Sequence, residues 1–291
     1  MTTTYQVDTG HVRAALTLPA ALILGDTANA ERALPGGWRL LPCDTARGAA
    51  IEVSFGAPRI RVSASTVQVR LPATVAASDT LAYLIYTVLE RARQHDRKVT
   101  VHATALHDPD GRAVLLLGAK GAGKTSTASA LVERGWTHAG DDLVVIGQDG
   151  DGRLAAWPGR PTAAVRDPAR PLAPKPLRDL SPFATVAAPV AWIIRLATHP
   201  DLASSLTSAT PLSLNERLRW HEGLARYISG LPTPLTGVAG VPYGPVWPLD
   251  SARCAHMRSD LIAGLHHTRF DYLYAPTARA AADLLLREVA S

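Results

Sequence analysis

Short apolar stretches interrupted by glycine and proline run through residues 11–70 of the chain. Stretches of this length, bounded by turn-forming residues, predict β-strands joined as hairpins. Residues 79–94 differ, because their apolar side chains recur at helical spacing and Ser78 or Asp79 can cap the first turn. We therefore expect an amphipathic helix there. The predicted strands are Ala20–Leu24, Ala50–Phe55, Ile60–Val62 and Val67–Leu71.

The centre of the chain combines a hairpin with a glycine-rich loop. Two strand-like runs, Val99–Leu106 and Ala113–Leu117, are joined by His107–Gly111, whose Asp, Pro and Gly favour a turn. The loop follows the second run directly. Thr125–Arg134 then has small and apolar residues at helical spacing, and Gly135 is a typical helix stop. The pattern predicts a strand, a loop and a helix in direct succession.

Strands, turns and helices alternate in the rest of the chain. The eight prolines from Pro158 to Pro189 argue against a continuous helix or a central strand in that segment. Gln148–Gly152 has the composition of a turn. The other predicted elements are strands at Leu143–Ile146, Arg153–Trp157, Val190–Leu196 and Phe270–Tyr274, helices at 213–229 and Thr277–Val289, and a Gly/Pro-rich loop at 230–248.

Composition narrows the class of protein. The chain has 291 residues, 47% of them hydrophobic, which suffices for a buried core. No run approaches the roughly 20 apolar residues of a membrane span, and the first residues lack the features of a signal peptide, so we expect a cytoplasmic protein without a membrane partner. The net charge of +5 comes from scattered arginines, which does not favour a nucleic-acid partner. The two cysteines, Cys43 and Cys254, are expected to be packing residues.

The glycine-rich loop matches the phosphate-binding pattern G-x-x-x-x-G-K-[ST] at every fixed position. Its backbone N–H groups and the following helix N-terminus would converge on one anion, while glycine lets the backbone approach the phosphates. Lys124 would contact the β- and γ-phosphates and Thr125 would ligate Mg²⁺, so ATP and Mg²⁺ are the expected cofactors. The alternative is a glycine-rich turn without a ligand. The expected binding residues are Gly118, Ala119, Lys120, Gly121, Ala122, Gly123, Lys124, Thr125 and Ser126.

Two adjacent carboxylates, Asp141 and Asp142, stand before the apolar run that begins at Leu143. In phosphoryl transfer one carboxylate can accept the proton of the attacking hydroxyl, and another can orient Mg²⁺. Both aspartates are therefore catalytic candidates together with Lys124, and Asp142 is the expected metal ligand beside Thr125. The alternative is a solvated turn or a helix cap.

These motifs together resemble the kinase domain of the HPr serine kinase/phosphorylase family. The resemblance covers about Val101–Trp157: a histidine, His102, on the strand before the loop, then the loop, its helix and the Asp pair before a strand. It implies a P-loop fold similar to phosphoenolpyruvate carboxykinase, with a mixed α/β sheet. It further implies that the Asp pair activates a serine, that His102 lies near the phosphates, and that copies of the chain form a homo-oligomer.

The chain departs from that family after the acidic pair. Where the family has a glutamate-containing signature rich in Arg and Gly, this chain has Ala156–Pro161, which puts the reverse reaction and HPr as the target in doubt. The N-terminal part instead resembles shorter related kinases, some of which phosphorylate a serine of a lasso-peptide precursor. The expected division is an N-terminal α+β region at 1–97 and a P-loop kinase domain with a C-terminal extension at 98–291.

Other residues are weaker candidates. Arg160 and Arg166 could neutralise charge on a transferred phosphoryl group, but exposed surface positions are the simpler expectation for both. His256, His266 and His267 lack an acidic or cysteine partner at metal-ligand spacing and are expected on the surface. His102 could equally be a buried strand residue.

The sequence thus favours an ATP-dependent kinase that acts on a serine-type hydroxyl of a peptide or protein. Within the enzyme class, the alternative is a kinase for a small-molecule hydroxyl. From another class comes a regulator that binds ATP without transferring phosphate; it would need Lys124 but neither aspartate as a base.

Overall fold

The computed structural model describes residues 1–9, 12–22, 39–42, 49–63, 66–76, 79–165, 176–228 and 249–290. The chain divides into two compact units. The first consists of Met1–Val99 with Leu224–Arg258, and the second of Thr100–Gly223 with Ser259–Ser291. The segment 224–258 thus belongs to the same unit as the N-terminal residues. The division predicted from the sequence, with its boundary between residues 97 and 98, placed this segment in the C-terminal domain. Within the described residues, no helix is long and apolar enough to cross a membrane.

The first unit is a mixed sheet in the order β3-β1-β2-β4-β6-β5. Its strands alternate buried and exposed residues, as in β6, so that one face supplies the core. Leu16, Ile51 and Val69 on the strands form a cluster with Ile85 and Leu89 of the helix α3. The elements are β1 Thr2–Asp8, β2 Arg13–Pro19, β3 Arg39–Pro42, β4 Ala49–Phe55, β5 Arg59–Val62, β6 Thr66–Leu71, α2 Ala73–Ala76 and α3 Asp79–His95.

Residues after 224 complete this unit. Ile228, Leu249 and Cys254 belong to the same buried cluster as the strands of the N-terminal sheet. The described chain here includes the start of α6 (Ala252–Gly264), which the sequence analysis did not predict. Cys254 is a buried free thiol, as expected of a packing residue. Cys43 lies outside the described residues, as does the whole predicted loop at 230–248.

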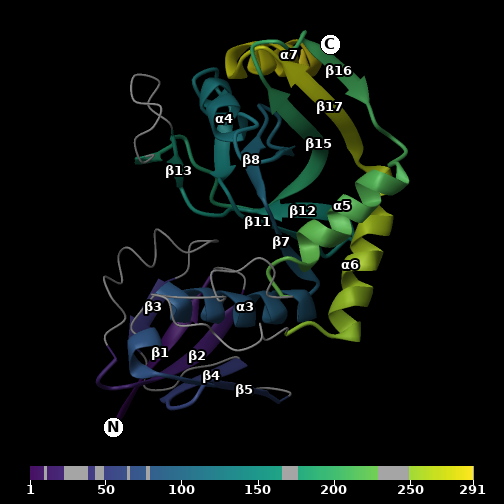
Figure 1. Ribbon diagram of the computed structural model, residues 1–291. Helices are drawn as coiled ribbons and strands as arrows, with labels where there is room; N and C mark the ends of the chain where they lie inside the picture. The colour runs from purple at the N-terminus through teal and green to yellow at the C-terminus, as the bar shows by residue number, and fades with distance from the viewer. Residues whose placement is uncertain are drawn as a thin grey trace. The chain divides into compact units, whose positions relative to one another are not determined.

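The second unit is built on a nine-stranded mixed sheet, so the expectation of a mixed α/β sheet is confirmed (Figure 1). Central β15 runs parallel to β9 and β17, whereas β8 pairs with β9 and β10 antiparallel. The strands are β7 Lys98–Val101, β8 Ala103–His107, β9 Ala113–Leu117, β10 Thr137–Gly140, β11 Val144–Gln148, β12 Leu154–Trp157, β15 Ala188–Thr198, β16 Ser205–Ser208 and β17 Arg269–Ala275. The separate pair is β13 Thr162–Ala164 with β14 Leu177–Asp179.

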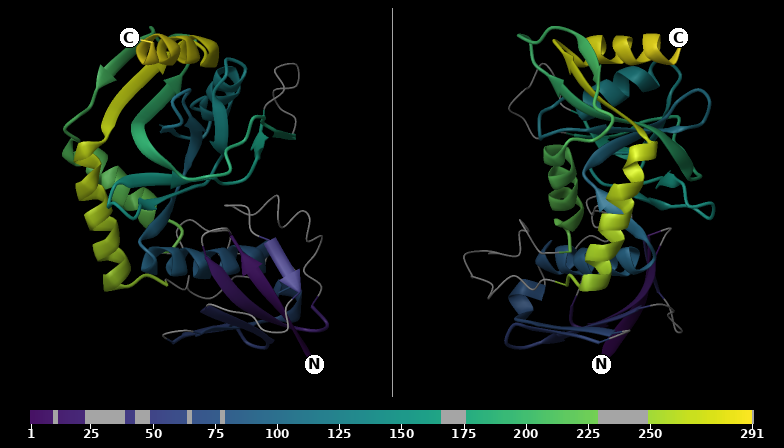
Figure 2. Two further views of the ribbon diagram at one scale, coloured as in Figure 1. Left: turned by 180° about the vertical axis from the view of Figure 1, so that it is seen from behind. Right: turned by 90° about the vertical axis from the view of Figure 1, so that its right-hand side faces the viewer.

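Two helices share one face of this sheet. α4 (Lys124–Val132) and α7 (Ala278–Val289) lie side by side in both views of Figure 2 and pack against each other. Leu131 and Leu285 join Leu116 and Ile194 of the strands in one buried cluster. Two further helical elements are α5 Leu214–Ala225 and η2 Leu265–His267. Since α4 starts directly after the loop, this packing fixes the direction in which the helix N-terminus points.

Most predicted elements are confirmed within one to three residues at their ends. The predicted strand Ala20–Leu24 is wrong at its start, because Ala20 and Ala21 form the turn that ends β2. The single strand Val99–Leu106 is two strands, interrupted at His102. β10 was missed, because its sequence Thr-His-Ala-Gly lacks apolar alternation and contains only one residue, Thr137, that favours strands.

Gly135, at the end of α4, offers a clean test of this local geometry. Its φ is +93° and a Cβ there would meet nothing within 4 Å, so Gly135→Ala adds backbone strain without a clash. We expect the free energy of unfolding to fall by about 1 kcal/mol. Urea unfolding followed by circular dichroism measures it. Gly150→Ala is the matched control, because a Cβ at Gly150 would also meet nothing within 4 Å and Gly150 lacks a left-handed φ. The free energy of unfolding of this variant should not fall.

Candidate functional site

The sheet register brings the sequence candidates to one edge. Leu117, the last residue of β9, pairs with Ala103 at the start of β8, and Gly140 at the end of β10 pairs with Ala105. The residue before β8, the loop after β9 and the Asp pair after β10 therefore lie at the same edge of the sheet. Three segments far apart in the sequence converge there because antiparallel neighbours alternate in direction.

The loop between β9 and α4 is a turn that only glycine can make. Gly118, Gly121 and Gly123 have φ values of +153°, +91° and +93°. A Cβ at Gly123 would lie 2.4 Å from Thr198 Oγ1, and one at Gly118 would lie 2.6 Å from the Leu196 carbonyl oxygen. β15 is therefore packed directly behind the loop. Gly121 faces open space, so the outer side of the loop is free for a ligand.

Further hydrogen bonds hold the loop against β15. The backbone N–H and the hydroxyl of Thr198 both donate to the Ala122 carbonyl oxygen, at 3.1 Å and 3.2 Å. Lys124 is buried, and its ammonium group donates to the carbonyl oxygens of Gly118 and Ala119 at 2.9 Å and 3.3 Å. The ammonium group of Lys124 therefore lies against the backbone of the loop.

The two aspartates point into different surroundings. Asp142 has a left-handed backbone, with φ of +68°, and the Leu143 N–H donates to the Asp141 carbonyl oxygen at 2.9 Å. Asp141 is 3% exposed, whereas the side chain of Asp142 is 58% exposed. This tight turn therefore separates two neighbouring carboxylates into an inner and an outer one.

Asp141, the inner carboxylate, joins the loop to the sheet. Its Oδ1 accepts a hydrogen bond of 2.5 Å from the Thr104 hydroxyl of β8. The Thr125 hydroxyl, in the first turn of α4, lies 3.1 Å from both carboxylate oxygens. A hydroxyl and a carboxylate are hard oxygen ligands of the kind that Mg²⁺ prefers. Thr104 carries no motif, and the sequence analysis missed it.

Asp142, the outer carboxylate, lies against His102. The distance between His102 Nε2 and Asp142 Oδ1 is 3.2 Å. The hydrogen bond from His102 is the largest effect on the pKa of Asp142 and lowers it. Burial of the carboxyl group raises this pKa. The charges of His102, Arg160 and Lys124 lower it further, so that the pKa lies below its ordinary value. His102 is part-exposed in the break between β7 and β8, so it is not the buried strand residue considered as the alternative.

Arg160 reaches this edge from the segment after β12. Gly159 N–H donates to the Ala139 carbonyl oxygen at 2.7 Å, which holds the segment against β10. Arg160 is 8% exposed, so the expectation of a solvent-exposed arginine is wrong. Its charge acts on Asp142 and on His138, a fully buried histidine of β10 whose pKa is lowered by burial. Arg166 lies outside the described residues.

The three candidate histidines near the C-terminal end lie away from the loop and the Asp pair. His256, His266 and His267 are exposed, as expected, and the described residues contain no group of three or more His, Cys, Asp or Glu side chains that could hold a metal. A site that relies on one or two protein oxygens plus phosphates is the usual arrangement for Mg²⁺, and it needs no such group. Lys120 and Ser126 lie in the loop and the first turn of α4.

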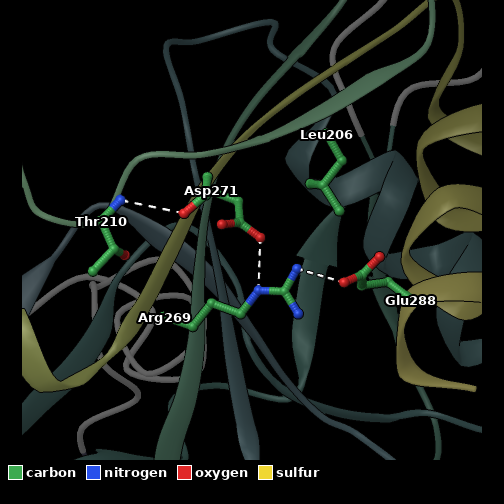
Figure 3. A pocket seen from close by; sticks show the side chains of 6 residues that line it. Leu206, Thr210, Arg269, Asp271 and Glu288 are labelled. Carbon is green, nitrogen blue, oxygen red and sulfur yellow. Dashed lines mark hydrogen bonds and ion pairs between the residues drawn. The ribbon is translucent and has the colours of Figure 1, made fainter. Parts of the chain in front are cut away.

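A shallow cavity of about 520 Å³ on β16, β17 and α7 has different chemistry (Figure 3). The Arg269 guanidinium bonds Asp271 at 2.8 Å and Glu288 at 2.7 Å, and lies over the Trp192 ring at 4.2 Å. Asp271 is almost fully buried. Two carboxylates around one guanidinium repel a triphosphate, so this cavity does not suit a phosphate ligand.

Comparisons with known proteins add little. No family model and no curated protein matches the chain. Among solved structures, the HPr(Ser) kinase/phosphatase from Coxiella burnetii is similar over 36% of this chain and 70% of that chain, with 18% sequence identity and a TM-score of 0.28. A likeness this weak carries no argument about the function of this chain.

The pair of His102 and Asp142 is testable in the metal-free protein. In His102→Ala the carboxylate loses its hydrogen-bond donor, so we expect the pKa of Asp142 to rise towards its ordinary value. In the wild-type protein the pKa of Asp142 is lower in the folded state than in the unfolded state. The ionised carboxylate therefore adds to the free energy of unfolding above the unfolded-state pKa, and this contribution is lost as the pH falls through the folded-state pKa. Carbon-detected NMR titration of Asp142 measures the shift. An unchanged titration midpoint would contradict the pairing; His199→Ala is the control.

Proposed function

We propose that this chain is an ATP-dependent, Mg²⁺-requiring kinase that transfers the γ-phosphoryl group to a serine-type hydroxyl of a peptide or protein. The observation that carries the proposal is the placement of two aspartates in different surroundings beside one glycine-rich loop. A fold of the HPr kinase type, with its P-loop, is part of the proposal.

The inner carboxylate suits metal binding. Asp141 and the Thr125 hydroxyl are adjacent, and Thr104 orients the carboxylate from β8. We therefore assign the Mg²⁺ site to Thr125 and Asp141, in place of the Asp142 expected from the sequence. When bound, Mg²⁺ would neutralise charge on the phosphates. The loop N–H groups and Lys124 would hold the triphosphate, and Lys124 would exchange its loop carbonyl partners for phosphate oxygens.

The outer carboxylate suits proton transfer. Asp142 is accessible, and its pKa lies below the ordinary aspartate value, so the carboxylate is ionised at neutral pH as a proton acceptor has to be. The acceptor oxygen would attack the γ-phosphorus, the bond from that phosphorus to the bridging oxygen of ADP would break, and the hydroxyl proton would pass to Asp142. His102 would hold the carboxylate in position, and the buried Arg160 would contribute positive charge at the transferred group.

The two aspartates should respond differently to neutralisation. Asp142→Asn removes the base, so we expect kcat to fall about 10²- to 10⁴-fold with little change in nucleotide affinity. Asp141→Asn removes a metal ligand, so we expect in addition a higher Mg²⁺ concentration for half-maximal activity. Transfer from γ-labelled ATP to candidate acceptor peptides, including any short peptide encoded beside the gene, measures both.

Asp151→Asn is the matched control, since Asp151 is an exposed turn residue. Full transfer by both active-site variants would overturn the catalytic assignment. If ATP binds and no acceptor is labelled by the wild-type protein, the non-catalytic regulator becomes the better description. If only free hydroxy-amino acids are labelled, a kinase for a small-molecule hydroxyl becomes the better description.

Lys124→Ala tests the loop independently of the aspartates. The variant removes the positive charge that would lie between the β- and γ-phosphates, so we expect ATP to bind at least about tenfold more weakly. Calorimetric titration with a non-hydrolysable ATP analogue measures the change. Lys120→Ala, elsewhere in the same loop, serves as a comparison for the specific contribution of Lys124. Unaltered affinity in Lys124→Ala would contradict the phosphate-loop assignment.

A further inference from the structure

A second cavity, of about 630 Å³, lies in the same unit as the glycine-rich loop but at the opposite edge of the sheet. The turn between β11 and β12, the first residues of β15, the end of α6 and the short helix η2 surround it. Its volume falls in the range of small-molecule pockets, roughly 300–1,000 Å³. It is therefore large enough for a ligand of its own.

The cavity is distinct from the proposed kinase site. β15 lines it through Pro189 and Val190, and the same strand ends at Thr198, which bonds the glycine-rich loop. Eight residues of extended chain separate Val190 from Thr198, which corresponds to roughly 26 Å. A ligand in this cavity would not reach the phosphates.

The walls are largely apolar. Leu154, Val190 and Leu261 line the cavity, and Val190 and Leu261 are buried. Ala263 and Gly264 add small surfaces from the end of α6. Such walls favour a ligand with an apolar body, because burying that body removes it from water.

The ionisable side chains that line the cavity are all basic. They are Arg153, His266 and His267, and none of the described residues that line the cavity is acidic. In the described part of the chain, the Arg153 guanidinium has no hydrogen-bond or ion-pair partner. The nearby carboxylate of Asp149 is engaged instead by backbone, accepting from the N–H groups of Asp151 and Arg153 at 2.9 Å and 2.8 Å.

The two histidines form a fixed pair at the rim. Their ring centroids are 3.6 Å apart, and His266 Nδ1 bonds the Ala263 carbonyl oxygen. Because a carbonyl oxygen only accepts, Nδ1 carries the hydrogen and the ring is oriented by that bond. The positive charge of Arg153 at this cavity attracts an anion.

We propose that this cavity binds a small ligand that has an apolar body and a carboxylate. The planar guanidinium of Arg153 matches a carboxylate with two parallel hydrogen bonds, while the apolar walls take up the body. Two sources share this chemistry: a free aliphatic or aromatic acid, and the C-terminal carboxylate of a short apolar peptide. The proposal does not depend on the kinase assignment, because no residue of the glycine-rich loop takes part.

The experiment compares acids with their uncharged amides on the full-length protein. 4-Phenylbutyrate and 4-phenylbutyramide form one arm, and acetyl-Leu-Phe as free acid and as amide forms the other, each titrated by calorimetry. We expect at least one acid to bind tenfold or more tightly than its amide, and the arm with the tighter acid identifies the source. Equal binding of acid and amide in both arms, or no binding by either acid, overturns the proposal.

Variants locate the binding in the cavity. Arg153→Met should weaken acid binding at least tenfold, whereas Arg178→Met, in exposed β14, should leave it unchanged. Ala263 is exposed, so Ala263→Glu can place a carboxylate at the cavity without burying that carboxylate. The Glu variant should abolish acid binding by charge repulsion, whereas the uncharged Ala263→Gln should retain it. Lys124→Ala should bind the acid normally, which separates this test from that of the kinase. Full affinity in both Arg153→Met and Ala263→Glu would show that the acid binds elsewhere.

Discussion

The buried carboxylate of Asp141 is the constraint on which the candidate site depends. It accepts a hydroxyl hydrogen bond from β8 and lies within hydrogen-bond distance of the first turn of α4, so it connects the sheet with the helix that follows the glycine-rich loop. A buried carboxylate without such partners would be strongly disfavoured. The partners therefore determine where the turn between β10 and β11 can lie, and with it the direction of Asp142.

The surrounding packing serves the same geometry. Thr198 and Leu196 of β15 leave no room for a Cβ behind the loop. The buried face of α4 packs against α7. The loop is consequently supported from the back and open at Gly121. A rigid backing of this kind allows backbone N–H groups to be oriented before a ligand arrives, which reduces the ordering cost of binding.

The two units divide the sequence in a way that no local pattern indicates. Ile228 and Leu249 are ordinary apolar residues in the sequence, yet they complete the core formed by strands more than 150 residues earlier. Ile228 and Leu249 follow and precede the helices α5 and α6, respectively, and it is the course of the chain between these helices that brings them to the N-terminal strands. Periodicity reports which face of an element is apolar, but not which other element covers it.

The sequence by itself determined the glycine-rich loop, the strand before it and the helix after it, because apolar runs, glycines and a lysine at fixed spacing act locally. It also determined that two carboxylates stand together at Asp141 and Asp142. Only the tertiary structure decided which of them is inner and which is outer, because that difference depends on Thr104, Thr125 and His102, which come from separate elements. The burial of Arg160 was likewise decided by the packing of Gly159 against β10, a contact between residues twenty positions apart that no spacing in the sequence could indicate.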